Sequence, residues 1–153
     1  MNDLIVDVKL WGQSVGSLYW EKESNAALFD YERKFIRSGL DISPIIMPIA
    51  QYRNTPYQFL ENRTDCFKGL PGLFADSLPD TFGNQIINEW FASRGLSGEE
   101  ITPLDRLCYV GKRGMGALEF EPYSPINGMN ESSVLHIEEL TELTSFYAST
   151  MDE

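Results

Sequence analysis

The apolar residues near the start of the chain alternate with polar ones. They occupy every second position from Leu4 to Leu10, and Ile5 is the one apolar residue out of phase. This spacing is typical of a strand with one buried face. A second β-rich run covers 15–20, and two glycines in the segment 11–16 suit a tight turn. The chain is therefore predicted to open with a β-hairpin.

Two further strands are predicted before residue 50. Residues 27–31 form the third, and residues 40–49 the fourth. Pro44 and Pro48 cannot donate a backbone hydrogen bond, so the fourth is expected at a sheet edge or as two short pieces. Residues 51–80 are rich in Pro and Gly and are expected to be loop-like.

Helical signals dominate after residue 80. Asp80 can cap a helix that runs to about Arg94 and stops at Gly95. The segment 102–105 reads Thr-Pro-Leu-Asp, a capping threonine with proline at the first helical position, and this second helix ends at Gly111. The amphipathic stripe of the first helix consists of Ile86, Ile87, Trp90 and Phe91.

A returning strand is predicted near 116–121 and a last amphipathic helix over 136–149. The fold class is then α+β, an N-terminal antiparallel sheet with hairpins followed by two or three packed helices and a returning strand. We expect one domain over 1–153, mainly β to residue 50 and mainly helical from 80. The predicted core comprises Leu4, Val6, Val8, Leu18, Phe29, Ile45, Leu73, Phe74, Ile87, Trp90, Phe91, Leu107 and Phe120.

Charge and composition exclude several classes of protein. The 153 residues contain 12 Lys or Arg against 23 Asp or Glu, a net charge of −11. Such a total repels nucleic-acid phosphates and anionic lipids. The start has two acids and no long apolar run, so neither a signal peptide nor a membrane helix is predicted. Cys66 and Cys108 form no metal-binding or disulfide pattern. We expect a cytoplasmic protein that binds neither DNA nor membranes.

Two motifs resemble catalytic patterns. The G-x-S-x-G pattern at 12–16 marks a serine nucleophile where a strand turns into a helix. Here strands are predicted on both sides, and His136 is the only histidine, so the glycines are expected to serve the hairpin. The glycine-rich loop 111–116 follows a helix and leads to a strand, opposite to a phosphate-binding loop. We interpret it mainly as a helix stop and turn, with contact to an anion or partner as the alternative.

Packing explains only part of the segment 69–80, in which Leu73, Phe74 and Leu78 can pack in a short helical turn. Within this segment, the stretch 73–80 reads Leu-Phe-Ala-Asp-Ser-Leu-Pro-Asp. It resembles the F-x-D-x-L-P-D signature in the N-terminal region of HipA-type kinases, the toxins of bacterial toxin–antitoxin pairs. The block from Pro103 to Leu118 is similar to that family's helix, G-x-D-x-x-G-A loop and strand, although Arg113 stands where an acid is frequent. The role of that acid therefore cannot be transferred. The opening residues Val15, Gly16 and Leu18 fit the family's x-V-G-x-L element.

The resemblance implies that this chain corresponds to roughly the first third of a HipA-type serine/threonine kinase. In that family the phosphate loop, the ATP lysine and the catalytic and metal-binding Asp and Asn follow this region. The resemblance thus assigns no catalytic, cofactor or metal residue here, and ATP and Mg²⁺ would bind the kinase core. Aminoacyl-tRNA synthetases are the substrate class that the family implies.

Two explanations of this relation stay open. The chain is either the N-terminal docking and regulatory domain of such a kinase, or a separate small subunit that binds and inhibits a separately encoded kinase. Leu140, Leu143 and Tyr147 are candidates for the face that the kinase core would cover. The reading frame after codon 153 separates the two explanations. A HipB-like antitoxin is a further partner that the family implies.

Docking is expected at the segment 73–80 and the loop 111–116. A DNA-binding role is rejected because the largest basic group in the sequence is Arg33, Lys34 and Arg37. The candidate interface residues are Phe74, Asp76, Leu78, Pro79, Asp80, Lys112 and Arg113.

Overall fold

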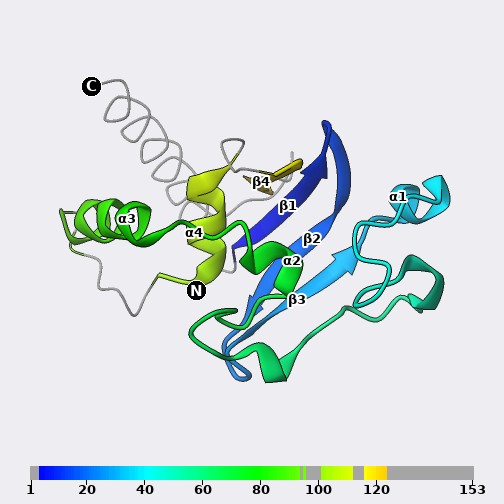
Figure 1. Cartoon of the computed structure of the whole chain (residues 1–153), viewed down its shortest axis with the longest axis horizontal. Coiled ribbons are helices and arrows are strands. Elements are labelled where there is room, and N and C mark those ends of the chain that lie inside the picture. Colours follow the sequence, from blue (N-terminus) through cyan, green and yellow to red (C-terminus); the bar gives the residue numbers. More distant parts are fainter. Residues whose placement is uncertain (1–3, 94, 96–100, 112–115, 124–153) are drawn as a thin grey trace, which may run out of the picture.

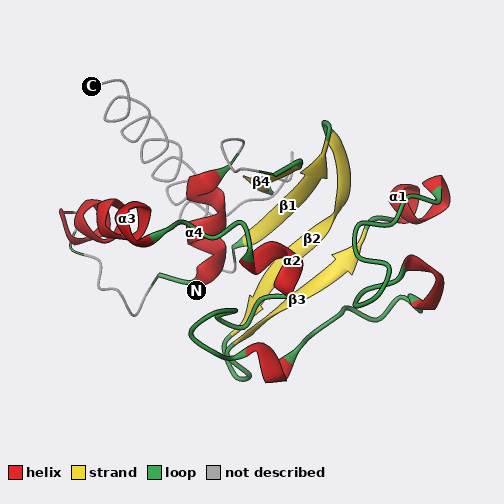
Figure 2. Cartoon of the chain, in the orientation of Figure 1, coloured by secondary structure: helices red, strands yellow, loops and turns green. Residues whose placement is uncertain are grey.

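The computed structural model describes residues 4–93, 95, 101–111 and 116–123, and it has the predicted α+β architecture. The strands β1 (Ile5–Leu10), β2 (Gln13–Glu21), β3 (Ala26–Tyr31) and β4 (Leu118–Pro122) form one antiparallel sheet in the order β3-β2-β1-β4. The helices are α1 (Arg33–Ser38), α2 (Gly72–Ala75), α3 (Thr81–Ser93) and α4 (Pro103–Val110), with short 3-10 turns at Ile49–Gln51 and Leu60–Asn62. Figures 1 and 2 show α3 and α4 at one end of the molecule and α1 at the other.

The opening hairpin is confirmed. Val6 and Val8 of β1 are fully buried, whereas Ile5 is exposed, as the alternation predicts. Trp11 and Gly12 both have positive φ, 51° and 78°, the pattern of the type I′ turns that join twisted strands. The Ser14 hydroxyl donates to Oδ1 of Asp7 in the neighbouring strand at 2.7 Å. The G-x-S-x-G pattern therefore belongs to a hairpin, and His136 lies outside the described residues.

A β-bulge explains why valine and glycine follow each other at positions 15 and 16. Val8 pairs with Gly16 but Lys9 pairs with Ser14, so Val15 is the extra residue of β2. Both Val15 and Gly16 are buried. A Cβ at Gly16 would lie 2.4 Å from the carbonyl oxygen of Asp30 and 2.7 Å from Cζ of Phe29. Only glycine fits beneath that ring, which explains why the V-G-x-L element has glycine at position 16.

The core lies on one face of the sheet, where aromatic rings join the strands to α2. The ring of Phe29 packs at 4.8 Å between centroids against Phe74, whose ring lies 6.1 Å from that of Phe120. Leu4 and Leu73 of the predicted core are half-buried and pack against it. The remaining predicted core residues except Ile45 are buried, namely Val6, Val8, Leu18, Phe29, Phe74, Ile87, Trp90, Phe91, Leu107 and Phe120.

The predicted strand over 40–49 is wrong, and so is the placing of Ile45 in the core. The Asp41 carboxylate accepts the N–H groups of Ser43 at 3.1 Å and Ile49 at 3.2 Å, which folds the segment into a loop. Met47 is the buried residue, and its carbonyl accepts the Tyr31 hydroxyl at 2.6 Å. Ile45 is 88% exposed. Pro44 and Pro48 have no N–H group to donate to a neighbouring strand. The Asp41 side chain instead bonds backbone N–H groups of the segment and forms a local loop.

Both predicted helices in the second half are present. Asp80 lies directly before α3, and α4 begins with a complete capping box between Thr102 and Asp105. The returning strand begins at Leu118, two residues later than predicted. Helix α1 was not predicted, because six residues without a capping side chain provide little local signal. The helix expected over 136–149 lies outside the described residues. Among the helices described, none is long and apolar enough to cross a bilayer.

Candidate docking surface

The segment Leu73–Asp80 is anchored by one aromatic residue. Phe74 is fully buried between Phe29 of β3 and Phe120 of β4. Helix α2 places this ring inward, and the turn that follows is closed by bonds from Ser77 N–H to the Phe74 carbonyl and from Leu78 N–H to the Ala75 carbonyl. Phe74 therefore holds the segment on the sheet and cannot itself contact a partner.

Asp76 is the first exposed residue after Phe74, since Ala75 is buried. Within the described part of the chain its carboxylate makes no hydrogen bond or ion pair. Its backbone N–H donates to the Gly72 carbonyl at 3.1 Å, so its position is set by α2. Leu78 and Pro79 are half-buried. An acid and two apolar side chains are thus presented on a rigid base.

Asp80 has a structural task. Its Oδ1 accepts the Gly83 N–H at 2.8 Å and caps α3. The Asn84 amide donates to the Pro79 carbonyl at 3.2 Å, and a Cβ at Gly83 would lie 3.0 Å from Cβ of Pro79. The end of the segment Leu73–Asp80 (the docking segment) therefore packs against the start of α3 as one unit. Aspartate at position 80 is explained by that cap.

Phe82 is an exposed aromatic residue that the sequence reasoning missed. It lies in the first turn of α3 and is 59% exposed. A helical wheel reveals it, because Phe82 falls away from the buried stripe of Ile87, Trp90 and Phe91. Its position two residues after Asp80 extends the candidate surface onto α3. We define the docking surface as Asp76, Leu78, Pro79 and Phe82.

Helix α4 braces α3 through one guanidinium. Arg106 donates to Oδ1 of Asn84 at 2.8 Å and to Oδ1 of Asn88 at 3.0 Å. Partial burial lowers the pKa of Arg106, and the nearby Asp105 carboxylate opposes that shift. Asp105 is itself buried and accepts the Thr102 N–H at 2.7 Å. This arrangement fixes the helix from which the docking surface projects.

The loop 111–116 is only partly described. Gly111 ends α4 with φ of 55°, where its N–H donates to the Leu107 carbonyl at 2.9 Å. Its own carbonyl accepts the Phe120 N–H at 3.3 Å, which ties the start of the loop to β4. Lys112 and Arg113, the two basic residues of the candidate interface, lie outside the described residues.

The described residues include no constellation suited to metal chemistry. No group of three or more His, Cys, Asp or Glu side chains in that part of the chain could hold a metal ion. Cys66 is exposed and Cys108 is buried, and both are free thiols. Burial, followed by the charge of Asp105, raises the pKa of the Cys108 thiol well above its usual value.

A comparison with protein families adds one finding. The family described as the HipA N-terminal domain matches residues 6–121, from β1 to β4. The matched range includes the entire docking surface and the loop 111–116. No curated protein matches the chain.

Proposed function

Because the chain belongs to the HipA N-terminal domain family, we propose that it is the docking and regulatory domain of a HipA-like toxin serine/threonine kinase in a toxin–antitoxin system. In this role the chain does not transfer phosphate by itself. ATP and Mg²⁺ bind the kinase core, and a HipB-like antitoxin is a second partner. The chain acts by contact with that core and does not bind DNA or membranes directly.

The observation that carries this proposal is the construction of the docking surface. A buried Phe74 fixes the segment, while Asp76 is exposed without a partner among the described residues. Exposed Phe82 and half-buried Leu78 and Pro79 add apolar area beside that acid. Aromatic side chains are enriched at protein-binding surfaces, which supports the exposed Phe82 as a contact residue.

A second version of the proposal uses the same surface. In it the chain is a stand-alone subunit that binds and inhibits a separately encoded HipA-type kinase. Both versions place Asp76 and Phe82 against a kinase core, and they differ in whether that core is on the same chain. The genomic reading frame after codon 153 decides between them, by continuing into a kinase core or by stopping before a second gene that encodes one.

The test of docking uses the kinase core identified in this way, expressed as a separate protein. Binding of the 153-residue chain to that core is measured by calorimetry for the wild type, Asp76→Arg and Phe82→Ala. The matched control is Glu23→Arg, which makes the same charge change at an exposed position in the turn between β2 and β3. We expect each docking variant to weaken binding about tenfold or more, the usual effect of an interface hot spot.

The control is expected to bind like the wild type, and all variants should unfold at the same urea concentration. If the wild type binds the core and both Asp76→Arg and Phe82→Ala bind it equally well, docking uses another surface. A chain that does not bind the core at all would contradict the proposal itself.

A further inference from the structure

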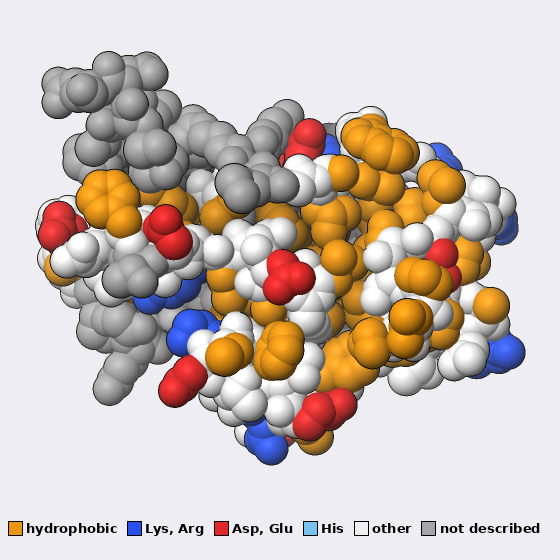
Figure 3. All heavy atoms as spheres, in the orientation of Figure 1, with side chains coloured by type: hydrophobic (Ala, Val, Ile, Leu, Met, Phe, Trp, Pro, Cys, Tyr) orange, Lys and Arg blue, Asp and Glu red, His pale blue; other side chains and the backbone are white. Residues whose placement is uncertain are grey.

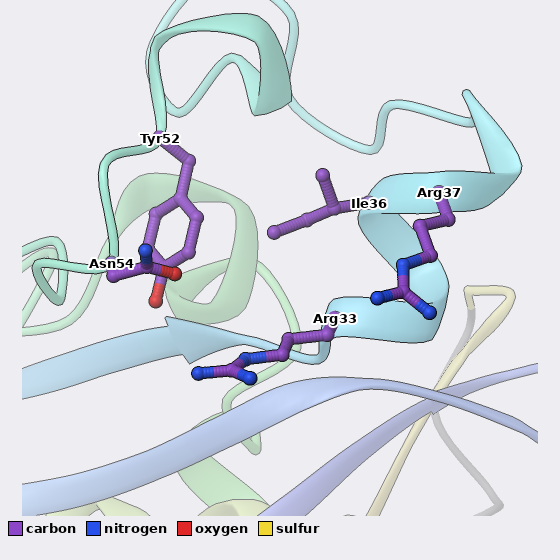
Figure 4. A pocket seen from close by; sticks show the side chains of 5 residues that line it. All are labelled: Arg33, Ile36, Arg37, Tyr52 and Asn54. Atoms are coloured by element: carbon purple, nitrogen blue, oxygen red, sulfur yellow. The ribbon is translucent and has the colours of Figure 1, made fainter.

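A hollow lies beside α1. This helix is at the end of the molecule away from α3 and α4 (Figure 1). The hollow measures about 350 Å³ and is lined by Arg33, Ile36, Arg37, Tyr52 and Asn54. Figure 4 shows the Arg33 side chain extending from α1 toward Tyr52 and Asn54, with Arg37 on the same side of the helix. We call this hollow the α1 pocket. It shares no residue with the docking surface.

Two guanidinium groups line this pocket, and none of its lining residues is acidic. Arg33 and Arg37 are four residues apart on a helix whose first turn contains no acid. Within the described part of the chain, neither forms a salt bridge. Like charges at this spacing destabilise a helix. An anion bound between them would offset this repulsion.

The charge of this region is opposite to that of the whole chain. Residues 30–60 contain four Lys or Arg and three Asp or Glu, a net charge of +1, whereas the chain carries −11. Of these acids, Asp41 accepts the N–H groups of Ser43 and Ile49, and Asp30 accepts the Tyr52 hydroxyl. Basic side chains follow the right-hand edge of the molecule in Figure 3, next to apolar side chains that extend toward α2. The field of the pocket therefore attracts an acidic ligand.

The pocket also has a rigid apolar wall. The Tyr52 hydroxyl donates to the Asp30 carboxylate, and its ring lies 5.6 Å from that of Tyr31 and 6.2 Å from that of Tyr57. Ile36 is half-buried beside it. Burial raises the pKa of Asp30, and the positive charge of Arg33 opposes that shift, which places the two groups within electrostatic reach. The Tyr52 hydroxyl thus bonds the Asp30 carboxylate, and among the described residues neither arginine of the pocket forms a salt bridge.

The segment after α1 adds exposed apolar residues. Leu40 is 47% exposed, Ile46 is 56% exposed, and Ile45 is 88% exposed at the tip of the loop. That loop is held in place by the bonds to Asp41 and by the bond from the Tyr31 hydroxyl to the Met47 carbonyl. A partner that enters the pocket therefore meets cations and apolar side chains together.

We propose that the α1 pocket binds an acidic peptide segment of a partner protein. Carboxylate or phosphate oxygens of the peptide accept hydrogen bonds from Arg33 and Arg37, and a neighbouring apolar side chain packs on Ile36 and Tyr52. A peptide suits the site better than DNA or a lipid surface, since the acidic remainder of the chain repels an extended array of phosphates. A hollow of this size accepts single side chains.

The test uses the whole chain and three fluorescein-labelled synthetic peptides in which leucine alternates with glutamate, phosphoserine or glutamine. Binding is followed by fluorescence anisotropy, and the contact site is mapped by NMR chemical shifts. We expect the glutamate or the phosphoserine peptide to bind with salt-dependent affinity and the glutamine peptide at least about tenfold more weakly. The stronger of the first two identifies carboxylate or phosphate as the source of the anion.

Arg33→Glu and Arg37→Glu should each reduce this affinity about tenfold or more. Lys22→Glu is the matched control, because Lys22 is an exposed cation in the turn between β2 and β3, away from the pocket. Three results would overturn the proposal. These are equal binding of the glutamine peptide, an equal loss in Lys22→Glu, and stronger Arg37-dependent binding to duplex DNA or to phosphatidylserine vesicles. Failure of this test leaves kinase docking unaffected, because the two surfaces share no residue.

Discussion

Arg106 of α4 donates to Asn84 of α3 at 2.8 Å, and Asn84 in turn donates to the carbonyl of Pro79 at 3.2 Å. This chain of two hydrogen bonds connects α4 to the end of the docking segment. Neither Arg106 nor Asn84 lies on the docking surface itself. Through these two hydrogen bonds, α3 and α4 hold the end of the docking segment in place.

Removal of this connection should lower the stability of the domain. Arg106→Ala is expected to reduce the free energy of unfolding by about 1–3 kcal/mol, since it leaves a half-buried amide without its charged partner. Urea denaturation followed by circular dichroism measures the change. Asn84→Ala should cost more than Asn88→Ala, because Asn88 is exposed and does not bond Pro79. Equal losses in the two asparagine variants would contradict this account.

Gly16 should not tolerate a side chain. Gly16→Ala places a methyl group 2.4 Å from the Asp30 carbonyl oxygen, which belongs to the backbone of the paired strand β3 and cannot move aside. We expect a loss of about 3 kcal/mol or more, at the upper end of the cost of overpacking. Gly116→Ala serves as the control, because the nearest atom to its added Cβ is 4.0 Å away. Thermal unfolding of both variants checks the prediction, and a stable Gly16→Ala protein would refute the close approach.

The two aspartates of the docking segment should differ in stability and in binding. Asp80→Ala is expected to cost about 1 kcal/mol because it removes the N-cap of α3. Asp76→Ala should change stability by less than about 0.5 kcal/mol, as is usual for an exposed residue without a specific contact. Chemical denaturation separates the two effects. Only Asp76 is then suitable for a docking assay, and an equal stability loss at both positions would show that Asp76 has a structural partner.

The buried thiol should make the fold sensitive to alkaline pH. Burial raises the pKa of Cys108, and also that of the Tyr31 hydroxyl, above their usual values. Below the thiol's ordinary pKa of about 8.5 both folded and unfolded states keep the proton, so its contribution to stability is complete. Above that pH the unfolded state alone releases the proton. The free energy of unfolding should therefore fall as the pH rises above about 8.5, and the fall should continue toward the raised pKa of the folded thiol.

Urea unfolding at a series of pH values tests this decline. Cys108→Ala should have a smaller slope over the same range, whatever its stability at neutral pH. In the folded protein a thiol reagent should modify exposed Cys66 quickly and Cys108 only after unfolding. Rapid modification of both thiols in native buffer would contradict the burial of Cys108.

Local patterns in the sequence determined the elements whose signals lie within a few residues. The alternation of β1, the start of α3 after Asp80 and the capping box of α4 are all confirmed. A strand period and a helix cap depend on neighbours in the chain, so they can be predicted without knowledge of the fold. The exposure of the candidate interface residue Asp76 also depends on nearby residues, since its backbone N–H donates to the Gly72 carbonyl in the same turn.

The other features depend on contacts between residues that are far apart in the chain. Ile45 was expected inside, but Asp41 and Tyr31 hold the loop so that Met47 is buried instead. The need for glycine at position 16 depends on Phe29 of another strand. The α1 pocket exists because residues 52–54 fold back beside α1. Such contacts join residues far apart in the chain, so only the tertiary structure brings their side chains together.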